Sequence, residues 1–279
     1  MEVVLLGTGS PLPSPDRAGP STLVRAAGRD LLVDCGRGVL MRAAAVSSGA
    51  STLALVMLTH LHSDHVTDFG DIVTSRWVLS PTPLTLSVVG PVGTRRHVER
   101  TLQMLEDDIG YRIAHHDDLV DPPSVQVTEV APESDDTAVV VDADGLRILA
   151  AATDHAPVRP TVGYRVEADG GSVVLAGDTV PCAGLDALCH DADVYVQTVV
   201  RPSLIEAIPF KRLHDVLDYH SSIADAATTA ARAGVRTLVM THPVPAPAPG
   251  TEQQWIDEAA SHFGGRIVLG EDLTTVSCP

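Results

Sequence analysis

Short apolar runs, separated by glycine, proline or charged residues, recur from the start of the chain. This pattern is typical of buried strands, and it predicts strands at residues 2–7, 21–26, 30–35, 53–58 and 84–90. Helical spacing of apolar residues lies between and after these runs. It predicts a helix over 38–49 closed by Gly49, a helix over 66–79 that ends before Pro81, and a helical pattern over 92–110.

The second half of the chain repeats this alternation. Strands are predicted at residues 125–130, 138–143, 146–151, 162–167, 172–177, 194–200, 236–241 and 266–270, and helices at 184–190, 221–233 and 252–263. Asp-Gly steps in the stretches 142–145 and 168–171 supply the positive φ that tight hairpin turns need. Such an order predicts an α+β fold in which sheets pack together under helices. No linker rich in serine and glycine divides it, so we expect one domain over residues 1–279.

Composition narrows the class of protein further. Aromatic residues make up only 3% of the chain, so aliphatic side chains must build the core. No stretch reaches the roughly 18 apolar residues that a membrane span requires. The chain starts with an apolar strand rather than a basic leader, which predicts a cytoplasmic protein. The chain contains no C-x-x-C pair, so the sequence indicates neither a structural zinc ribbon nor a thioredoxin-like site.

The charge of the chain argues against a protein whose main task is to grip nucleic acid. The formal net charge is −17, and Lys211 is the only lysine. Such a charge repels polyanions at long range. A metal site can reverse the sign locally. Nucleic acid is therefore a disfavoured partner at this stage, but it stays open.

The stretch LTHLHSDHVTDFG, residues 58–70, concentrates side chains that bind metals. Histidine is scarce, at 12 in 279 residues, yet His60, His62 and His65 stand here together with Asp64. The preceding strand delivers the chain to the edge of a sheet, where the backbone turns before a helix and these side chains can converge. Neutral imidazoles and a carboxylate that meet at one point are typical of a zinc site.

Three later residues stand in the same context, at or just after the end of an apolar strand. They are His155, Asp178 and His242. Each one alone is typical of an ordinary loop residue and would not indicate a metal site. Together with the first cluster, they indicate a binuclear metal site built on one edge of a sheet.

The motifs LGTGSPLP, LLVDCGRG, LTHLHSDH, AGDT and LVMTH resemble the metallo-β-lactamase superfamily, and within it the branch of ribonuclease Z and arylsulfatase-like proteins. The resemblance runs from Val3 to about His242, which is most of the chain. It implies a four-layer αββα sandwich, in agreement with the number of predicted strands.

The resemblance also implies how the metal ligands are shared. Two zinc ions would be held by His60, His62 and His155 on one side, by Asp64, His65 and His242 on the other, and by Asp178 as a bridge. A hydroxide between the metals would be the nucleophile, because paired zinc ions bring the pKa of bound water near neutrality. Asp64 would also orient that hydroxide or accept its proton.

His220 is the second catalytic candidate. The segment DYHSSIADAATTAARAGVRTLVMTH resembles the part of ribonuclease Z in which a histidine before a helix helps to protonate the leaving group. Ser221 or Ser222 is a suitable helix cap, and Asp225 would lie in the first turn. The resemblance makes His220 a general acid or a hydrogen-bond partner of a metal ligand. A polar residue before a cap, without a catalytic role, is the alternative.

Three departures from ribonuclease Z decide the expected substrate. Only 22 residues separate His155 from Asp178, too few for the tRNA-gripping arm that this family commonly inserts there. The chain is strongly acidic, and PVPAPAP follows His242 in place of a continuation rich in serine and threonine. The leading hypothesis is therefore a binuclear zinc-dependent hydrolase of a small-molecule ester. A phosphodiester or sulfate ester is favoured over a lactone or thioester.

Other functions stay open beside this one. Within the same class, the alternative is a ribonuclease Z-type endonuclease that processes the 3′ end of tRNA. From other classes come an iron-dependent redox relative and a non-catalytic binding protein. Ligation by histidines with an Asp178 bridge favours zinc over iron, and the intact ligand set argues against loss of catalysis. The sequence also leaves a homodimer open.

Overall fold

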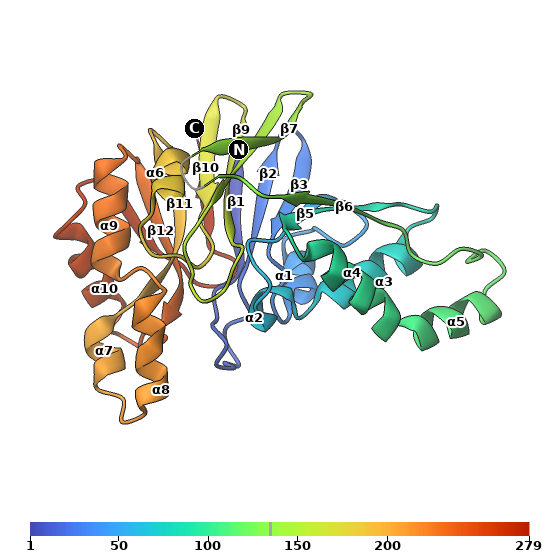
Figure 1. Ribbon diagram of the computed structural model, residues 1–279, viewed down its shortest axis with the longest axis horizontal. Helices are drawn as coiled ribbons and strands as arrows, with labels where there is room; N and C mark the ends of the chain where they lie inside the picture. Colours follow the sequence, from blue (N-terminus) through green and yellow to red (C-terminus); the bar gives the residue numbers. More distant parts are fainter. Residues whose placement is uncertain (134–135, 279) are drawn as a thin grey trace.

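A computed structural model describes residues 1–133 and 136–278 of the chain. In these residues, two sheets of seven strands lie face to face, and helices cover both outer faces (Figure 1). The first half of the chain builds one sheet, and the second half builds the other, apart from β14. The predicted four-layer αββα sandwich is confirmed.

The first sheet combines antiparallel and parallel pairs. Its strands, in spatial order, are β14 (Thr275–Ser277), β1 (Glu2–Gly7), β2 (Ser21–Ala26), β3 (Arg29–Val33), β4 (Leu53–Met57), β5 (Leu86–Pro91) and β6 (Val125–Val130). The β3, β4, β5 and β6 strands run parallel to one another, so their carboxyl ends share one edge of the sheet.

The second sheet repeats this arrangement. Its strands, in spatial order, are β13 (Arg266–Leu269), β12 (Thr237–Val244), β11 (Val194–Val200), β10 (Gly171–Leu175), β9 (Val162–Ala168), β8 (Leu146–Ala152) and β7 (Thr137–Ala143). The strands from β10 to β13 are parallel, whereas β7, β8 and β9 are joined by antiparallel pairing. At the two predicted hairpin turns, Asp144 and Gly145, and Asp169 and Gly170, all have positive φ.

The helices complete the outer layers. On the first sheet lie α1 (Val39–Ala45), α3 (Phe69–Leu79) and α4 (Thr94–Met104), and on the second lie α6 (Ala183–Cys189), α9 (Ile223–Arg232) and α10 (Glu252–Ala260). One apolar layer fills the space between the sheets, and two more fill the spaces under the helices. These three layers hold the carboxyl edges of both sheets in a fixed relation.

The structure departs from the predicted elements in several places. The helix predicted over 66–79 is divided into α2 (Ser63–Val66) and α3, and a further helix, α5 (Glu106–His115), continues through the predicted end at Gly110. The short helices α7 (Pro202–Glu206) and α8 (Lys211–His214) and a 3-10 turn, η1 (Asp215–Asp218), were not predicted, nor was β14. Segments of three to five residues are too short to carry a clear apolar period.

Within the described residues, no helix is both long and apolar enough to cross a membrane.

Candidate metal centre

The first cluster of ligand-type residues lies just beyond the carboxyl end of β4. The backbone N–H of Leu58 still donates to the Val89 carbonyl of β5, and the chain then leaves the sheet. His62 occupies the position before α2, while Asp64 and His65 lie inside that helix. The turn from strand to helix therefore collects these side chains at one point, as expected from the sequence.

The second sheet supplies the remaining ligand-type residues at its facing edge. His155 follows β8, and Asp178 follows β10. His242 does not end its strand as predicted, because β12 continues to Val244. Instead, the backbone of His242 has a φ of 48°, and the pairing of β11 with β12 shifts register nearby. This irregularity turns the side chain of His242 out of the regular alternation of the strand.

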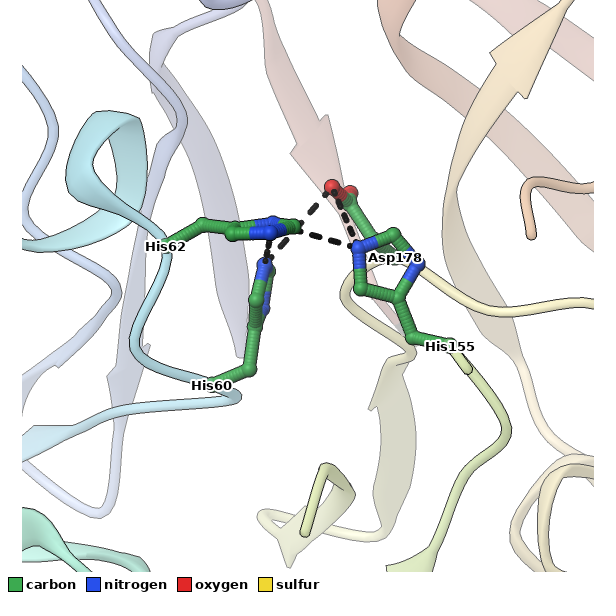
Figure 2. Close-up of side chains that lie close together, drawn as sticks. All are labelled: His60, His62, His155 and Asp178. Atoms are coloured by element: carbon green, nitrogen blue, oxygen red, sulfur yellow. Dashed lines mark hydrogen bonds and ion pairs between the residues drawn. The ribbon is translucent and has the colours of Figure 1, made fainter. Parts of the chain in front are cut away.

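Four of these residues form a first group (Figure 2). The Nδ1 atom of His62 lies 3.1 Å from Nε2 of His60 and 3.2 Å from Nε2 of His155. One ligand atom from each of these residues and one carboxylate oxygen of Asp178 all lie within 4.8 Å of one another. Figure 2 shows the four side chains pointing toward one another, with His60 and His62 on one loop and His155 and Asp178 on two other segments.

The other three residues form a second group beside the first. The ligand atoms of Asp64, His65 and His242 also lie within 4.8 Å of one another. The Oδ2 atom of Asp178 lies 3.3 Å from Nε2 of His65 and 3.8 Å from Nε2 of His60, so its carboxylate stands between the two groups. The structure thus brings together all seven residues that the sequence singles out as metal ligands.

Burial and charge set the protonation of this cluster. Burial lowers the pKa of His60, His62 and His155, and the pKa of His155 falls to about 4. These three imidazoles are neutral near pH 7, and a neutral imidazole has a lone pair that a metal can accept.

The two histidines of the second group behave differently. Burial alone would lower the pKa of His65 and of His242, but the charge of Asp178 and other nearby carboxylate contacts outweigh burial and raise both pKa values. Burial in turn would raise the pKa of the Asp178 carboxyl, yet the histidines around it bring that pKa well below its usual range. Metal binding here must displace protons from imidazoles.

The unsatisfied polar atoms of the cluster test whether a metal fits. In the described part of the chain, the buried atoms Nε2 of His65 and Oδ1 of Asp178 have no hydrogen-bond partner. The Nδ1–H of His155 donates to the Tyr219 carbonyl at 2.8 Å, so Nε2 of the neutral ring has no proton to share with His62. Divalent cations would bind the lone pairs of these nitrogen and oxygen atoms, which find no hydrogen-bond donor among the neighbouring side chains.

Asp34 supports the cluster from behind. Its Oδ1 atom accepts the backbone N–H of Thr59, and its Oδ2 atom accepts the Thr59 hydroxyl, both at 2.8 Å. The same Oδ2 atom lies 2.7 Å from Nδ1 of His65. A carboxylate that accepts the Nδ1–H of an imidazole fixes the tautomer in which Nε2 is free to bind a metal.

His220 also joins the cluster. Its Nδ1–H donates to the Val216 carbonyl at 3.0 Å, and its Nε2 atom lies 3.2 Å from Oδ2 of Asp178. His220 is buried, and Ser222 forms the N-terminal capping box of α9 with Asp225. The cap fixes the start of the helix, and His220 is thereby held against the proposed bridging carboxylate.

A cavity of about 200 Å³ opens onto both groups. Its walls include His62, Asp64, Asp178, His220 and His242. The cavity is also lined by residues that were not among the predicted site residues, including Leu12, Ile205, Arg212, Leu213 and Tyr219. Leu12 stands in the motif LGTGSPLP and Tyr219 directly precedes His220, whereas Ile205, Arg212 and Leu213 come from the α7 and α8 segment, where no motif or periodic pattern marks them. Val244 and Pro245, from the proline-rich stretch after His242, also line the cavity.

Comparisons with known proteins agree with this fold and cluster. A family model for the beta-lactamase superfamily domain matches residues 29–243. The chain is 58% identical over 278 residues to the ribonuclease Z of Mycobacterium avium (strain 104), covering 99% of this chain and 98% of that protein. It is 54% identical to the ribonuclease Z of Mycobacterium tuberculosis (strain H37Rv), covering 99% and 97% of the two chains.

Among solved structures, the short form of human tRNase Z has a TM-score of 0.75 at 22% identity, and the match covers 100% of both chains. YhfI of Bacillus subtilis has a TM-score of 0.74 at 21% identity, covering 99% of this chain and 98% of that one. At this level of identity, the two structures support the fold alone.

The fold and the matched family model define a metallo-β-lactamase superfamily protein. Within that superfamily, similarity along the whole chain shows that this protein belongs to the ribonuclease Z family.

This membership corrects the predictions of substrate and partner. The prediction of a small-molecule ester as substrate, with nucleic acid as a disfavoured partner, is wrong, because relatives at 54–58% identity over 278 residues are ribonucleases Z. This chain aligns with nearly the whole length of those relatives, so they contain no long additional arm either. The missing arm therefore does not separate this chain from its family. The negative net charge of the chain did not predict the substrate either, because a metal site can reverse the sign of the charge locally.

Proposed function

We propose that this chain is a zinc-dependent ribonuclease Z-type endonuclease that removes the 3′ extension of precursor tRNA. The observation that carries the proposal is the identity of 58% along the whole chain to a ribonuclease Z, with all seven ligand-type side chains in two adjoining groups that open onto one cavity through His62, Asp64, Asp178 and His242. Zinc suits the set of imidazole nitrogens and carboxylate oxygens. We take the chain to be one domain, because both sheets contribute to the same cluster.

In this proposal the ligands are shared as the sequence resemblance implied. His60, His62 and His155 would hold one ion, and Asp64, His65 and His242 the other, with Asp178 between them. Two such ions supply activation of water and stabilisation of the negative charge that develops on a phosphodiester. The protein keeps His60, His62 and His155 neutral by burial, so these rings bind metal without first losing a proton.

Asp64 and His220 would move the protons. Both line the cavity. The Asp64 carboxylate would accept the proton of the attacking water, and its Oδ2 atom lies 3.3 Å from Nε2 of His242. Nε2 of His220 would donate a proton to the departing oxygen, since Nδ1 is committed to the Val216 carbonyl.

A turnover comparison tests the proposal. The zinc-loaded chain is given a precursor tRNA with a 3′ extension and, separately, bis(p-nitrophenyl) phosphate and p-nitrophenyl sulfate. We expect cleavage of the tRNA at one bond near its mature 3′ end, with a kcat/KM far above that for either small ester. His62→Ala should nearly abolish cleavage. Intact precursor tRNA beside efficient hydrolysis of a small ester would contradict the proposal.

A further inference from the structure

One wall of the cavity comes from the segment between β11 and α9. It contains α7 and α8, which Figure 1 shows side by side at the end of the molecule below α9 and α10. Ile205, Ile208 and Leu213 from this segment contribute apolar surface to the cavity that holds the metal-ligand cluster. The wall is therefore placed where a nucleotide next to the reacting phosphate would lie.

Arg212 differs from the other residues of this wall. Within residues 1–133 and 136–278, it is the only lysine or arginine that lines the cavity. Many other arginines pair with carboxylates, as Arg201 does with Glu258 at 2.9 Å and Arg165 with Glu167 at 2.8 Å. Arg212 is exposed and forms no hydrogen bond or ion pair within the described chain. In a protein of net charge −17, this guanidinium remains free for an anion from outside.

We infer that Arg212 binds the RNA phosphate next to the scissile one, and that the apolar wall beside it receives the base of that nucleotide. This inference rests on the proposed function. A guanidinium donates two parallel N–H groups to phosphate oxygens, which fixes the position of the phosphate as well as its distance. Unpaired bases near an RNA end pack against apolar and aromatic side chains.

Arg212 is a positioning residue, because its proposed partner is not the phosphate that reacts. Its neighbour Lys211 provides a matched control. Both residues lie on α8 and both are exposed, but Lys211 does not line the cavity in the described structure. Removing either side chain removes one positive charge from the same helix. A difference in activity between the two variants would therefore come from a specific contact of Arg212 and not from the change in net charge.

The first test measures steady-state cleavage of precursor tRNA by the zinc-loaded enzyme and by R212A, R212K and K211A. For R212A we expect KM to rise about tenfold with kcat within about twofold, since one charged contact to phosphate is lost. The plot of log kcat/KM against log salt should become shallower by about 0.7. R212K should recover the salt slope but only part of the KM, because lysine lacks the planar fork. K211A should match the wild type.

The second test removes the phosphate charge instead of the arginine. A precursor tRNA with a neutral methylphosphonate linkage next to the scissile bond should raise the wild-type KM as much as R212A does. R212A should not distinguish this RNA from the unmodified one, because the two changes remove the same contact. Hydrolysis of bis(p-nitrophenyl) phosphate, which has no neighbouring phosphate, should fall far less in R212A than cleavage of precursor tRNA does.

The outcomes separate the two hypotheses. If the wild type fails to cleave precursor tRNA, the proposed function fails. If the wild type cleaves but R212A keeps the wild-type KM and salt slope, the inference about Arg212 is wrong while the function stands. Equal losses in R212A and K211A, or additive effects of R212A and the neutral linkage, would also overturn it.

Discussion

The Nδ1 atom of His65 lies 2.7 Å from the Oδ2 atom of Asp34. The same carboxylate accepts two hydrogen bonds from Thr59, the residue before His60. Asp34 thus connects the end of β3 to both the loop and the helix that carry the histidine cluster. It has a φ of 59°, in the left-handed region, and Thr59 and His65 hold its side chain in that turn.

Asp34→Asn is expected to weaken metal binding about 10- to 100-fold, because an amide is a poorer partner than a carboxylate for the ring of His65. The backbone should tolerate the change, since asparagine adopts positive φ readily. Competition with a chromophoric chelator measures the affinity. Asp169→Asn is the matched control, because Asp169 also has positive φ, at 55°, but lies in the turn between β9 and β10. Equal metal affinity in both variants would refute the role of Asp34.

His220→Ala is expected to slow cleavage of precursor tRNA by about 10² to 10⁴, the usual range for loss of a general acid. Metal content should stay unchanged, because the ring contacts Asp178 without belonging to either group of ligand-type residues. Single-turnover kinetics and elemental analysis provide the two readouts. His190→Ala, which removes an exposed histidine, should leave both at wild-type values. Loss of metal together with activity would make His220 a supporting residue instead.

Acid is expected to weaken zinc binding. The pKa values of His65 and His242 are raised above the ordinary 6.5, so these rings keep their protons to a higher pH than a free histidine does. Protons compete with the metal, and affinity should fall as the pH drops through those raised values. His155, with a pKa of about 4, stays neutral over this range. Titration calorimetry from about pH 8.5 to about pH 5.5 tests this, and a constant affinity above pH 6.5 would speak against it.

Gly177→Ala is expected to lower the free energy of unfolding by about 2–5 kcal/mol, the sum of strain at positive φ and overpacking. Gly177 has a φ of 66°, and an added Cβ would lie 2.7 Å from the side chain of Thr59. Gly170→Ala is the control, since its φ is also positive, at 82°, but nothing lies within 4 Å. It should cost about 1–2 kcal/mol. Urea unfolding measures both, and similar losses would show that the contact with Thr59 is unimportant.

Much of the fold could be predicted from the sequence because its strands are apolar and sharply bounded. The grouping of His60, His62, Asp64 and His65 is local, so their spacing alone revealed it. His155, Asp178 and His242 could be added only because each stands near a strand end, and the carboxyl ends of parallel strands meet at one edge.

Other features of the site depend on contacts that no local pattern records. The wall that contains Arg212 comes from short helices without a repeating apolar period, so nothing in the sequence marked it as part of the site. The substrate was misjudged for a different reason. The length of one segment and the net charge of the chain do not determine the substrate, whereas the chemistry depends on a few buried side chains at one edge of the sheets.

The central claim is that two metal ions held by the seven clustered side chains are needed for cleavage of precursor tRNA. The most direct measurement adds zinc stepwise to metal-free chain and follows cleavage of the precursor at each step. We predict that cleavage is absent without metal and reaches its maximum at two zinc ions per chain. Full cleavage without metal, or saturation at a single ion, would contradict the account.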